Sequence, residues 1–255
     1  MTDLTITGIR GGYPNAEDIV KGIDLTVSTG DLTVIIGPNG AGKSTFLKLV
    51  AGLLKPTEGS VRLMKKELPL GNAQAACKLG MSFVPQERNV FQSLTVRENL
   101  EMGGYLLRKD ARERLEEQLT RFPLLKSKLK EKAGNLSGGQ RQVLAMGVAL
   151  MTSPSVLLLD EPTAGLSPAA ADEIFELVRN LASGGIAILM VEQNALLALE
   201  YGSHGLVLVS GRKIREEPAS SLLRDDEVRH LFLGRRDNTR HTQTHPKKGE
   251  SHAQA

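Results

Sequence analysis

The sequence is poor in cysteine and in aromatic residues. Of its 255 residues, Cys77 is the one cysteine, none is tryptophan, and aromatic residues make up 4%. A single cysteine can form neither an intramolecular disulfide nor a zinc site built on several cysteines. This composition is typical of a protein that works in a reducing compartment.

Long hydrophobic segments are also missing. The stretch from Gln142 to Leu159 contains no charged residue and approaches the length of a membrane-spanning helix. Pro154 and its polar neighbours lie in the middle of it, where they would end a helix inside a bilayer. We therefore expect a buried helix followed by a buried strand. The first residues lack the basic region and the apolar run of a signal peptide, so none is expected.

Basic residues outnumber acidic residues only at the C-terminal end of the sequence. The formal net charge is +3, and the segment from Arg235 onward contains five basic and two acidic residues, which accounts for all of it. Residues 1–234 are neutral overall, so the basic balance is weak support for a nucleic-acid partner. The end of the chain has no hydrophobic periodicity, and we expect residues 235–255 to form a disordered basic tail.

Apolar runs typical of strands alternate with helical patterns along most of the chain. Such alternation predicts an α/β fold in which helices cover a mostly parallel sheet. Between about residues 90 and 134 the pattern becomes helical, with capping-box spacing at Thr95 and Glu98. The expected strands are 4–9, 24–28, 32–36, 81–84, 156–159, 186–191 and 206–209, and the expected helices include 44–54, 110–122, 143–151, one after Pro168 and one near 195–199.

The segment Gly37–Ser44 matches the pattern G-x-x-x-x-G-K-[ST] between a predicted strand and a predicted helix. Its glycines let successive N–H groups point at phosphate oxygens, and the helix adds its positive N-terminal end. Lys43 is expected to reach the β- and γ-phosphates of ATP, and the Ser44 hydroxyl to bind Mg²⁺. The expected nucleotide-binding residues here are Gly37, Pro38, Asn39, Gly40, Ala41, Gly42, Lys43, Ser44 and Thr45.

Two acidic residues end the apolar strand at 156–159. A carboxylate at the end of a buried strand is costly unless it faces a cation, so Asp160 is expected to bind Mg²⁺. Glu161 is placed to orient and deprotonate an attacking water, which makes it the expected catalytic base.

The segment Leu136–Gln140, with the sequence LSGGQ, opens another predicted helix. A serine hydroxyl, bare N–H groups and a helix dipole make a second phosphate site, formed by Ser137, Gly138, Gly139 and Gln140. One γ-phosphate does not need two such sites from the same chain, so this one would serve a partner's nucleotide. The alternative is an ordinary helix N-cap.

In this order and spacing, the three motifs resemble the nucleotide-binding domains of ABC ATPases over roughly residues 4–234. The resemblance implies a P-loop NTPase fold with a mostly parallel core sheet, an N-terminal antiparallel β subdomain and a helical signature subdomain. The ATP-binding domain would span residues 1–234, with the helical subdomain at about 88–150.

The same resemblance assigns further residues. Tyr13 would stack on adenine, and Gln86 would reach Mg²⁺ and the attacking water. Gln193 stands where most family members have a histidine that contacts the γ-phosphate, and Ser167 stands where an aspartate is usual. Glutamine donates a hydrogen bond but carries no proton or charge, so these departures leave the hydrolysis rate open.

Gly12-Tyr13, the segment 165–168 and the segment 191–194 are similar to one ATPase subunit of bacterial branched-chain (hydrophobic) amino-acid importers. This implies two membrane permeases, a second ATPase subunit that forms either a heterodimer or a homodimer with this chain, and a periplasmic binding protein as an indirect partner. It also implies a cytoplasmic position on the inner face of the membrane. No nucleic-acid partner is expected. Importers of urea and short-chain amides are an alternative, and so is a soluble ABC ATPase acting on ribosomes or DNA, although such proteins usually contain two ATP-binding domains. A small-molecule kinase would leave LSGGQ unexplained.

Overall fold

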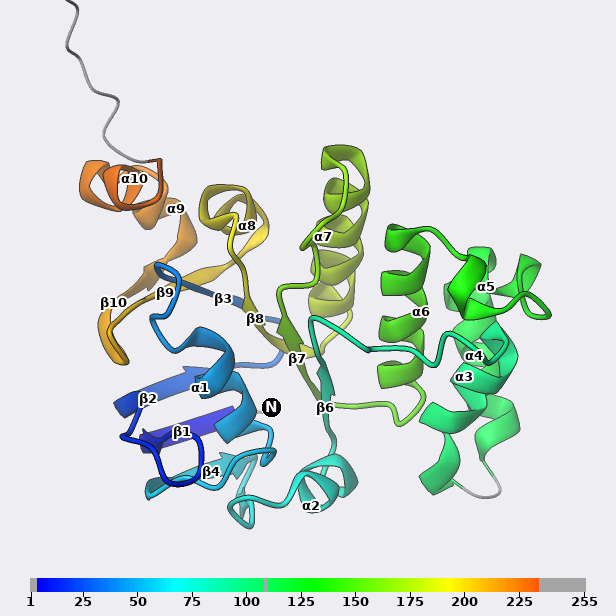
Figure 1. Cartoon of the computed structure of the whole chain (residues 1–255), viewed down its shortest axis with the longest axis horizontal. Helices are drawn as coiled ribbons and strands as arrows, with labels where there is room; N and C mark the ends of the chain where they lie inside the picture. The colour runs from blue at the N-terminus through cyan, green and yellow to red at the C-terminus, as the bar shows by residue number, and fades with distance from the viewer. Residues whose placement is uncertain (1–3, 108–109, 234–255) are drawn as a thin grey trace, which may run out of the picture.

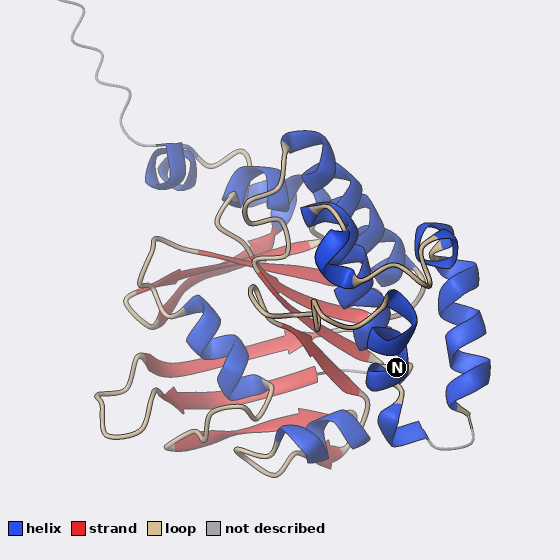
Figure 2. Ribbon diagram, turned by 45° about the vertical axis from the view of Figure 1, so that its right-hand side comes forward, coloured by secondary structure: helices blue, strands red, loops and turns tan. Residues whose placement is uncertain are grey.

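A six-stranded sheet lies at the centre of the molecule, for which a computed structural model describes residues 4–107 and 110–233 (Figures 1 and 2). Its strand order is β10-β9-β3-β8-β7-β6. All neighbours pair in parallel except β10, which is antiparallel to β9. The strands are β3 (Leu32–Ile36), β6 (Met81–Val84), β7 (Val156–Asp160), β8 (Ala187–Val191), β9 (His204–Val209) and β10 (Arg212–Pro218). The prediction of a mostly parallel core sheet is confirmed.

Strand β7 illustrates why the central strands are continuous apolar runs. All of its residues are buried, with Leu157 and Leu159 in one hydrophobic core and Val156 and Leu158 in the other. Because successive side chains of a strand point to opposite faces, the sheet must be covered on both sides. Helices α7 (Pro168–Ser183) and α8 (Ala195–Tyr201) contact β3 on one side, and α1 (Lys43–Val50) contacts β7 and β8 on the other.

The N-terminal strands form a separate antiparallel sheet in the order β2-β1-β4-β5. Its strands are β1 (Leu4–Gly11), β2 (Val20–Val27), β4 (Glu58–Leu63) and β5 (Lys66–Glu67). Helix α1 lies between the two sheets, since it contacts β1 as well as β7 and β8 (Figure 1). The helix that follows the Gly37–Ser44 loop is therefore held from both sides, and the expected antiparallel subdomain is present.

A group of helices lies beside the β6 edge of the central sheet (Figure 1). Helix α6 connects this group to the sheet, because it contacts both α3 and β6. The predicted capping box of Thr95 and Glu98 is present at the start of α3. The elements are α3 (Val96–Gly103), η1 (Tyr105–Leu107), α4 (Ala111–Arg121), α5 (Pro123–Ser127), η2 (Ala133–Asn135) and α6 (Gly138–Leu150), with α2 (Ala73–Lys78) next to β6.

Several boundaries differ from the expected ones. Helix α1 ends at Val50 and does not reach residue 54, because Gly52 adopts a left-handed conformation (φ 73°) that turns the chain. Helix α4 ends at Arg121, one residue before the expected end at 122. Pro123 begins α5, where proline fits the first helical position.

The C-terminal elements are β10, α9 (Ala219–Leu222) and α10 (Asp226–Leu233), none of which the hydrophobic pattern predicted. The uncharged stretch 142–159 divides into the end of α6 and strand β7, as expected. Within the described ranges, no helix is both long and apolar enough to cross a membrane. The predicted tail at 235–255 lies outside the described residues.

Candidate active site

The loop between β3 and α1 forms an open N-terminal helix end. Gly42, the residue before the helix, is left-handed (φ 97°), and no side chain caps the first turn of α1. The first N–H groups of a helix have no acceptor within the helix, so these point into the adjoining cleft of about 340 Å³. The cleft is lined by Ile19, Asn39, Gly40, Ala41, Gly42, Lys43, Ser44, Thr45 and Glu161.

The start of this loop is fixed by a close approach to β9. A Cβ atom on Gly37 would lie 2.2 Å from the carbonyl oxygen of Leu208, so no larger residue fits without moving the backbone. The glycine at this position is therefore required by the chain's own packing.

Lys43 is buried at the bottom of the cleft, with 5% of the residue exposed. Its Nζ donates hydrogen bonds to the carbonyl oxygens of Gly37 (2.8 Å) and Pro38 (3.4 Å). Burial lowers the pKa of the Lys43 ammonium, and the nearby carboxylates of Glu161, Asp160 and Glu192 oppose this shift. A cation held only by backbone oxygens is well suited to bind a phosphate.

Ser44 and Asp160 meet at the entrance to α1, where the Ser44 hydroxyl donates a hydrogen bond of 2.7 Å to Oδ1 of Asp160. Burial raises the pKa of the Asp160 carboxyl, while the bond from Ser44 and the charges of Lys48 and Lys43 lower it. A hydroxyl and a carboxylate beside a phosphate cradle are oxygen ligands of the kind Mg²⁺ prefers, so these residues fit a magnesium–nucleotide complex.

Glu161 has an unusual backbone conformation, left-handed with φ 46°. Such a conformation costs a non-glycine residue about 1–2 kcal/mol, and here a hydrogen bond from Glu161 N to Val191 O (2.9 Å) supports it. Gln86 Nε2 donates to Glu161 Oε2 at 2.9 Å. Burial raises the pKa of the Glu161 carboxyl, Lys43 lowers it and Asp160 raises it.

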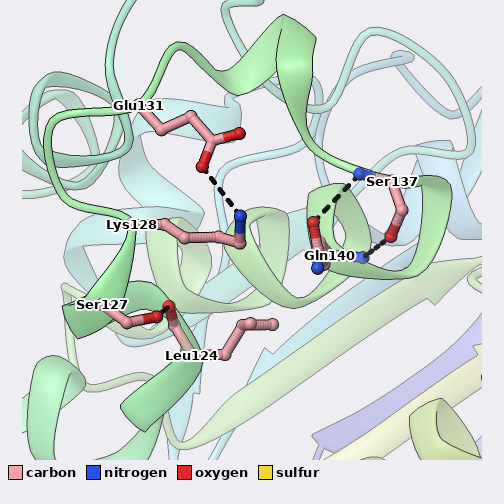
Figure 3. Close-up of polar contacts among 6 residues, drawn as sticks. All are labelled: Leu124, Ser127, Lys128, Glu131, Ser137 and Gln140. Carbon is pink, nitrogen blue, oxygen red and sulfur yellow. Dashed lines mark hydrogen bonds and ion pairs between the residues drawn. The ribbon is translucent and has the colours of Figure 1, made fainter.

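The start of α6 is closed by its own side chains (Figure 3). Ser137 N donates to Gln140 Oε1 at 3.1 Å, and Gln140 N donates to Ser137 Oγ at 3.3 Å, forming a complete capping box. Gly139 is not required by local packing, since a Cβ atom there would meet only the Cβ of Ala170 at an ordinary 3.4 Å.

Gly138 lies in a second cleft, of about 380 Å³, which does not include the loop 37–45. Gln86 and Glu161 also line it, so Glu161 lies between the two clefts. Asn89 Nδ2 donates to Gln142 Oε1 at 2.8 Å and so joins the segment after Gln86 to α6. The structure thus brings Gln86, Ser44, Asp160 and Glu161 together at the loop 37–45. Of the segment 137–140, Gly138 lines the different cleft.

The remaining predicted residues, Tyr13, Ser167 and Gln193, line neither cleft. Tyr13 is 45% exposed and lies beside α1, where Lys48 Nζ contacts its hydroxyl (3.3 Å) and lies 5.9 Å from the ring centre. Ser167 is the N-cap of α7, accepting a hydrogen bond from Ala170 N at 3.4 Å. A serine is a strong N-cap residue, which explains its presence at this position.

Glu192, which follows β8, is a further buried carboxylate for which the sequence motifs predict no role. It is 2% exposed and accepts hydrogen bonds from Thr163 N (3.0 Å), Thr163 Oγ1 (2.8 Å) and Gln193 N (3.2 Å). Burial raises the pKa of its carboxyl, and the three hydrogen bonds lower it. The available signal was a charged residue at the end of an apolar strand, the same signal that identified Asp160.

An open helix end after a glycine-rich loop, a buried lysine and a hydroxyl–carboxylate pair on a parallel sheet define an ATPase of the P-loop class. The sequence pattern of the family described as ABC transporter matches residues 20–164. The chain belongs to this family, and as such it binds and hydrolyses ATP.

Individual relatives are similar over almost the whole chain. The probable branched-chain amino acid transport ATP-binding protein LivF of Archaeoglobus fulgidus is 40% identical over 91% of this chain and 98% of its own. The lipopolysaccharide export system ATP-binding protein LptB of Haemophilus influenzae is 29% identical over 92% of this chain and 98% of its own. The crystal structure of the ADP conformation of MJ1267, an ATP-binding cassette of an ABC transporter, has a TM-score of 0.81 at 31% identity and covers 92% of this chain and 99% of its own.

Proposed function

We propose that this chain is the ATPase subunit of an importer of branched-chain or other hydrophobic amino acids. The observation that carries the proposal is the 40% identity to LivF over almost the full length of both chains, compared with 29% to the lipopolysaccharide exporter subunit. ATP binding closes two ATPase subunits around two nucleotides, and hydrolysis lets them separate. In this proposal the subunit lies on the cytoplasmic face of the membrane.

Each residue of the cleft has a proposed role. The N–H groups of residues 37–45 and the Lys43 ammonium bind the phosphates, and Tyr13 stacks on the adenine. Ser44, Asp160 and Gln86 hold Mg²⁺, which neutralises charge on the phosphates when bound. Glu161 accepts the proton of the attacking water, and Gln193 donates a hydrogen bond to the γ-phosphate.

Ser137, Gly138, Gly139 and Gln140 bind the nucleotide of the partner subunit. Two observations support this: Gly138 lines a cleft other than that of the loop 37–45, and no contact in the described chain requires glycine at 139. A glycine that its own chain does not need leaves room for a ligand to approach the backbone.

The permeases bind the helical subdomain, proposed to span residues 88–150 of a domain that extends over residues 1–234. Support comes from large apolar side chains that are exposed there: Phe91 (57%), Met102 (49%), Tyr105 (79%) and Leu106 (43%). Exposed apolar side chains of this size are common at protein–protein interfaces. The proposed complex also contains a second ATPase subunit and acts on cargo from a periplasmic binding protein.

The test is mass spectrometry of proteins that co-purify with this chain from gently solubilised membranes. Two permeases and a second ATPase are expected, and the binding protein of the same system should bind a hydrophobic amino acid. Tyr105→Ser should release the permeases. Ile214→Ser is the matched control, since Ile214 is also exposed (57%) but lies on β10. Recovery of ribosomal proteins or nucleic acid would contradict the transport assignment and leave the ATPase chemistry intact.

A further inference from the structure

Glu192 is the most deeply buried carboxylate near the nucleotide cleft among the described residues, and the proposed mechanism does not use it. It is 2% exposed, compared with 4% for Asp160. A buried carboxylate is expensive unless hydrogen bonds compensate for the lost water. Its three hydrogen bonds come from Thr163 N, Thr163 Oγ1 and Gln193 N, so uncharged donors supply the compensation.

These bonds connect two loops that carry the reacting residues. Thr163 follows Glu161 at the end of β7, and Gln193 follows β8, the neighbouring parallel strand. A further bond joins the same loops on the other side of Glu161, from Glu161 N to Val191 O at 2.9 Å. Glu161 is therefore held between two cross-strand connections, with its backbone in a left-handed conformation (φ 46°) that needs support.

We infer that Glu192 is a positioning residue for ATP hydrolysis, which fixes Glu161 and Gln193 relative to each other by bridging Thr163 and the Gln193 N–H. This rests on the roles proposed above for Glu161 and Gln193. An ionised carboxylate satisfies all three donors, because a carboxylate is acceptor-only. An amide at 192 can still accept from Thr163 through its oxygen, but its NH₂ group then faces the N–H of Gln193.

The first test is the ATPase activity of Glu192→Gln. Since small misplacements of catalytic groups can cost about 100-fold in rate, kcat should fall by about 10- to 100-fold. The Kd for ATP should stay within about twofold, because the loop 37–45 and Lys43 are unchanged. Unchanged kcat in a folded variant would overturn the inference, and so would a parallel loss of ATP affinity.

Thr163 provides a second route if Glu192→Gln does not fold. Thr163→Val removes the hydroxyl donor at nearly constant volume and should lower kcat without changing the Kd for ATP. Thr163→Ser keeps the hydroxyl and should recover most of the activity. Equal ATPase activity of the valine and serine variants would contradict a role for the hydrogen bond between Thr163 and Glu192.

A double-mutant cycle separates positioning from a general structural effect. If Glu192 acts through Gln193 and Glu161, then Glu192→Gln combined with Gln193→Ala should lower kcat by much less than the product of the two single effects. Independent, multiplicative effects would count against the inference. If Gln193→Ala and Glu161→Gln themselves leave turnover unchanged, the proposed roles fail. If those two lower turnover and Glu192→Gln does not, only the inference fails.

Discussion

Two helices of this protein begin after a serine- or glycine-rich segment, and their N-terminal ends are built differently. Gly42 precedes α1 in a left-handed conformation without any side-chain cap, whereas Ser137 and Gln140 close the first turn of α6 with a complete capping box. Gly37 before α1 is required by the approach of Leu208 O, while Gly139 in α6 has space for a side chain within its own chain.

The difference indicates how each helix end can bind an anion. The N–H groups at the start of α1 have no side-chain competitor, so a phosphate can bind there in a single subunit. At α6, Ser137 already accepts a backbone N–H, so a phosphate must compete with the capping box. We expect the first end to bind nucleotide alone and the second only when a partner presents one.

The largest effect is expected from Lys43→Ala, which removes the phosphate-binding cation at the start of α1. Hydrogen bonds to charged groups contribute about 1.5–3 kcal/mol, so ATP affinity should fall by about 10- to 100-fold, and hydrolysis with it. Isothermal titration of the purified chain with ATP measures this. Gly139→Ala is the control at the closed end and should bind ATP like the unmodified protein. Equal losses of affinity in both variants would contradict the comparison.

Gly139→Ala should lower turnover instead. Alanine favours the helix by up to about 1 kcal/mol over glycine, and the Cβ finds ordinary space near Ala170, so the fold should be retained or slightly stabilised. The new methyl group would obstruct a partner's nucleotide, and ATPase activity should fall by about tenfold or more, as a lost contact of about 1.4 kcal/mol would produce. Thermal unfolding together with ATPase assays measures the two effects. Normal turnover would mean that α6 carries only a helix cap.

A smaller effect distinguishes the cap of α6 from the buried carboxylate of Glu192 by the pH dependence of the free energy of unfolding. Ser137→Ala removes a neutral cap and should reduce the free energy of unfolding by about 1 kcal/mol at every pH. Burial raises the pKa of Glu192 above its ordinary 4.5, so the stability linked to this group is present below pH 4.5 and is lost as the pH rises through the raised pKa. As the pH rises above 4.5, the free energy of unfolding of the unmodified protein should therefore fall relative to that of Glu192→Gln. Denaturant unfolding at a series of pH values measures this difference. A constant difference between these two proteins would contradict the raised pKa.

The sequence predicted those elements whose hydrophobic pattern matches their burial in the folded protein. The apolar runs of β3, β6 and β7 were recognised because both faces of the central sheet are buried. Strand β10 was missed because its exposed and half-covered residues alternate at the edge of the sheet and include charges, so no apolar run marks it.

In the candidate site, sequence motifs identify the residues that contact a ligand. They identify less readily the residues that position those ligand-contacting residues. The loop 37–44 and the pair Asp160–Glu161 could be predicted from residue type and spacing. Glu192 also follows an apolar strand, but its role could not be predicted, because that role depends on Thr163, which lies 29 positions away in the loop after the neighbouring strand. The left-handed conformation of Glu161 likewise has no signal in the sequence.

Helix α6 is proposed to complete the nucleotide site of a second subunit. The most direct test is the molecular mass in solution, by light scattering, of Glu161→Gln, a variant that should bind ATP without hydrolysing it. In millimolar ATP the mass should be twice the 27.5 kDa of one chain, and adding Gly139→Ala should return it to that of the monomer. A monomer in both cases, with ATP bound and with the second ATPase subunit also present, would contradict closure of two subunits around ATP.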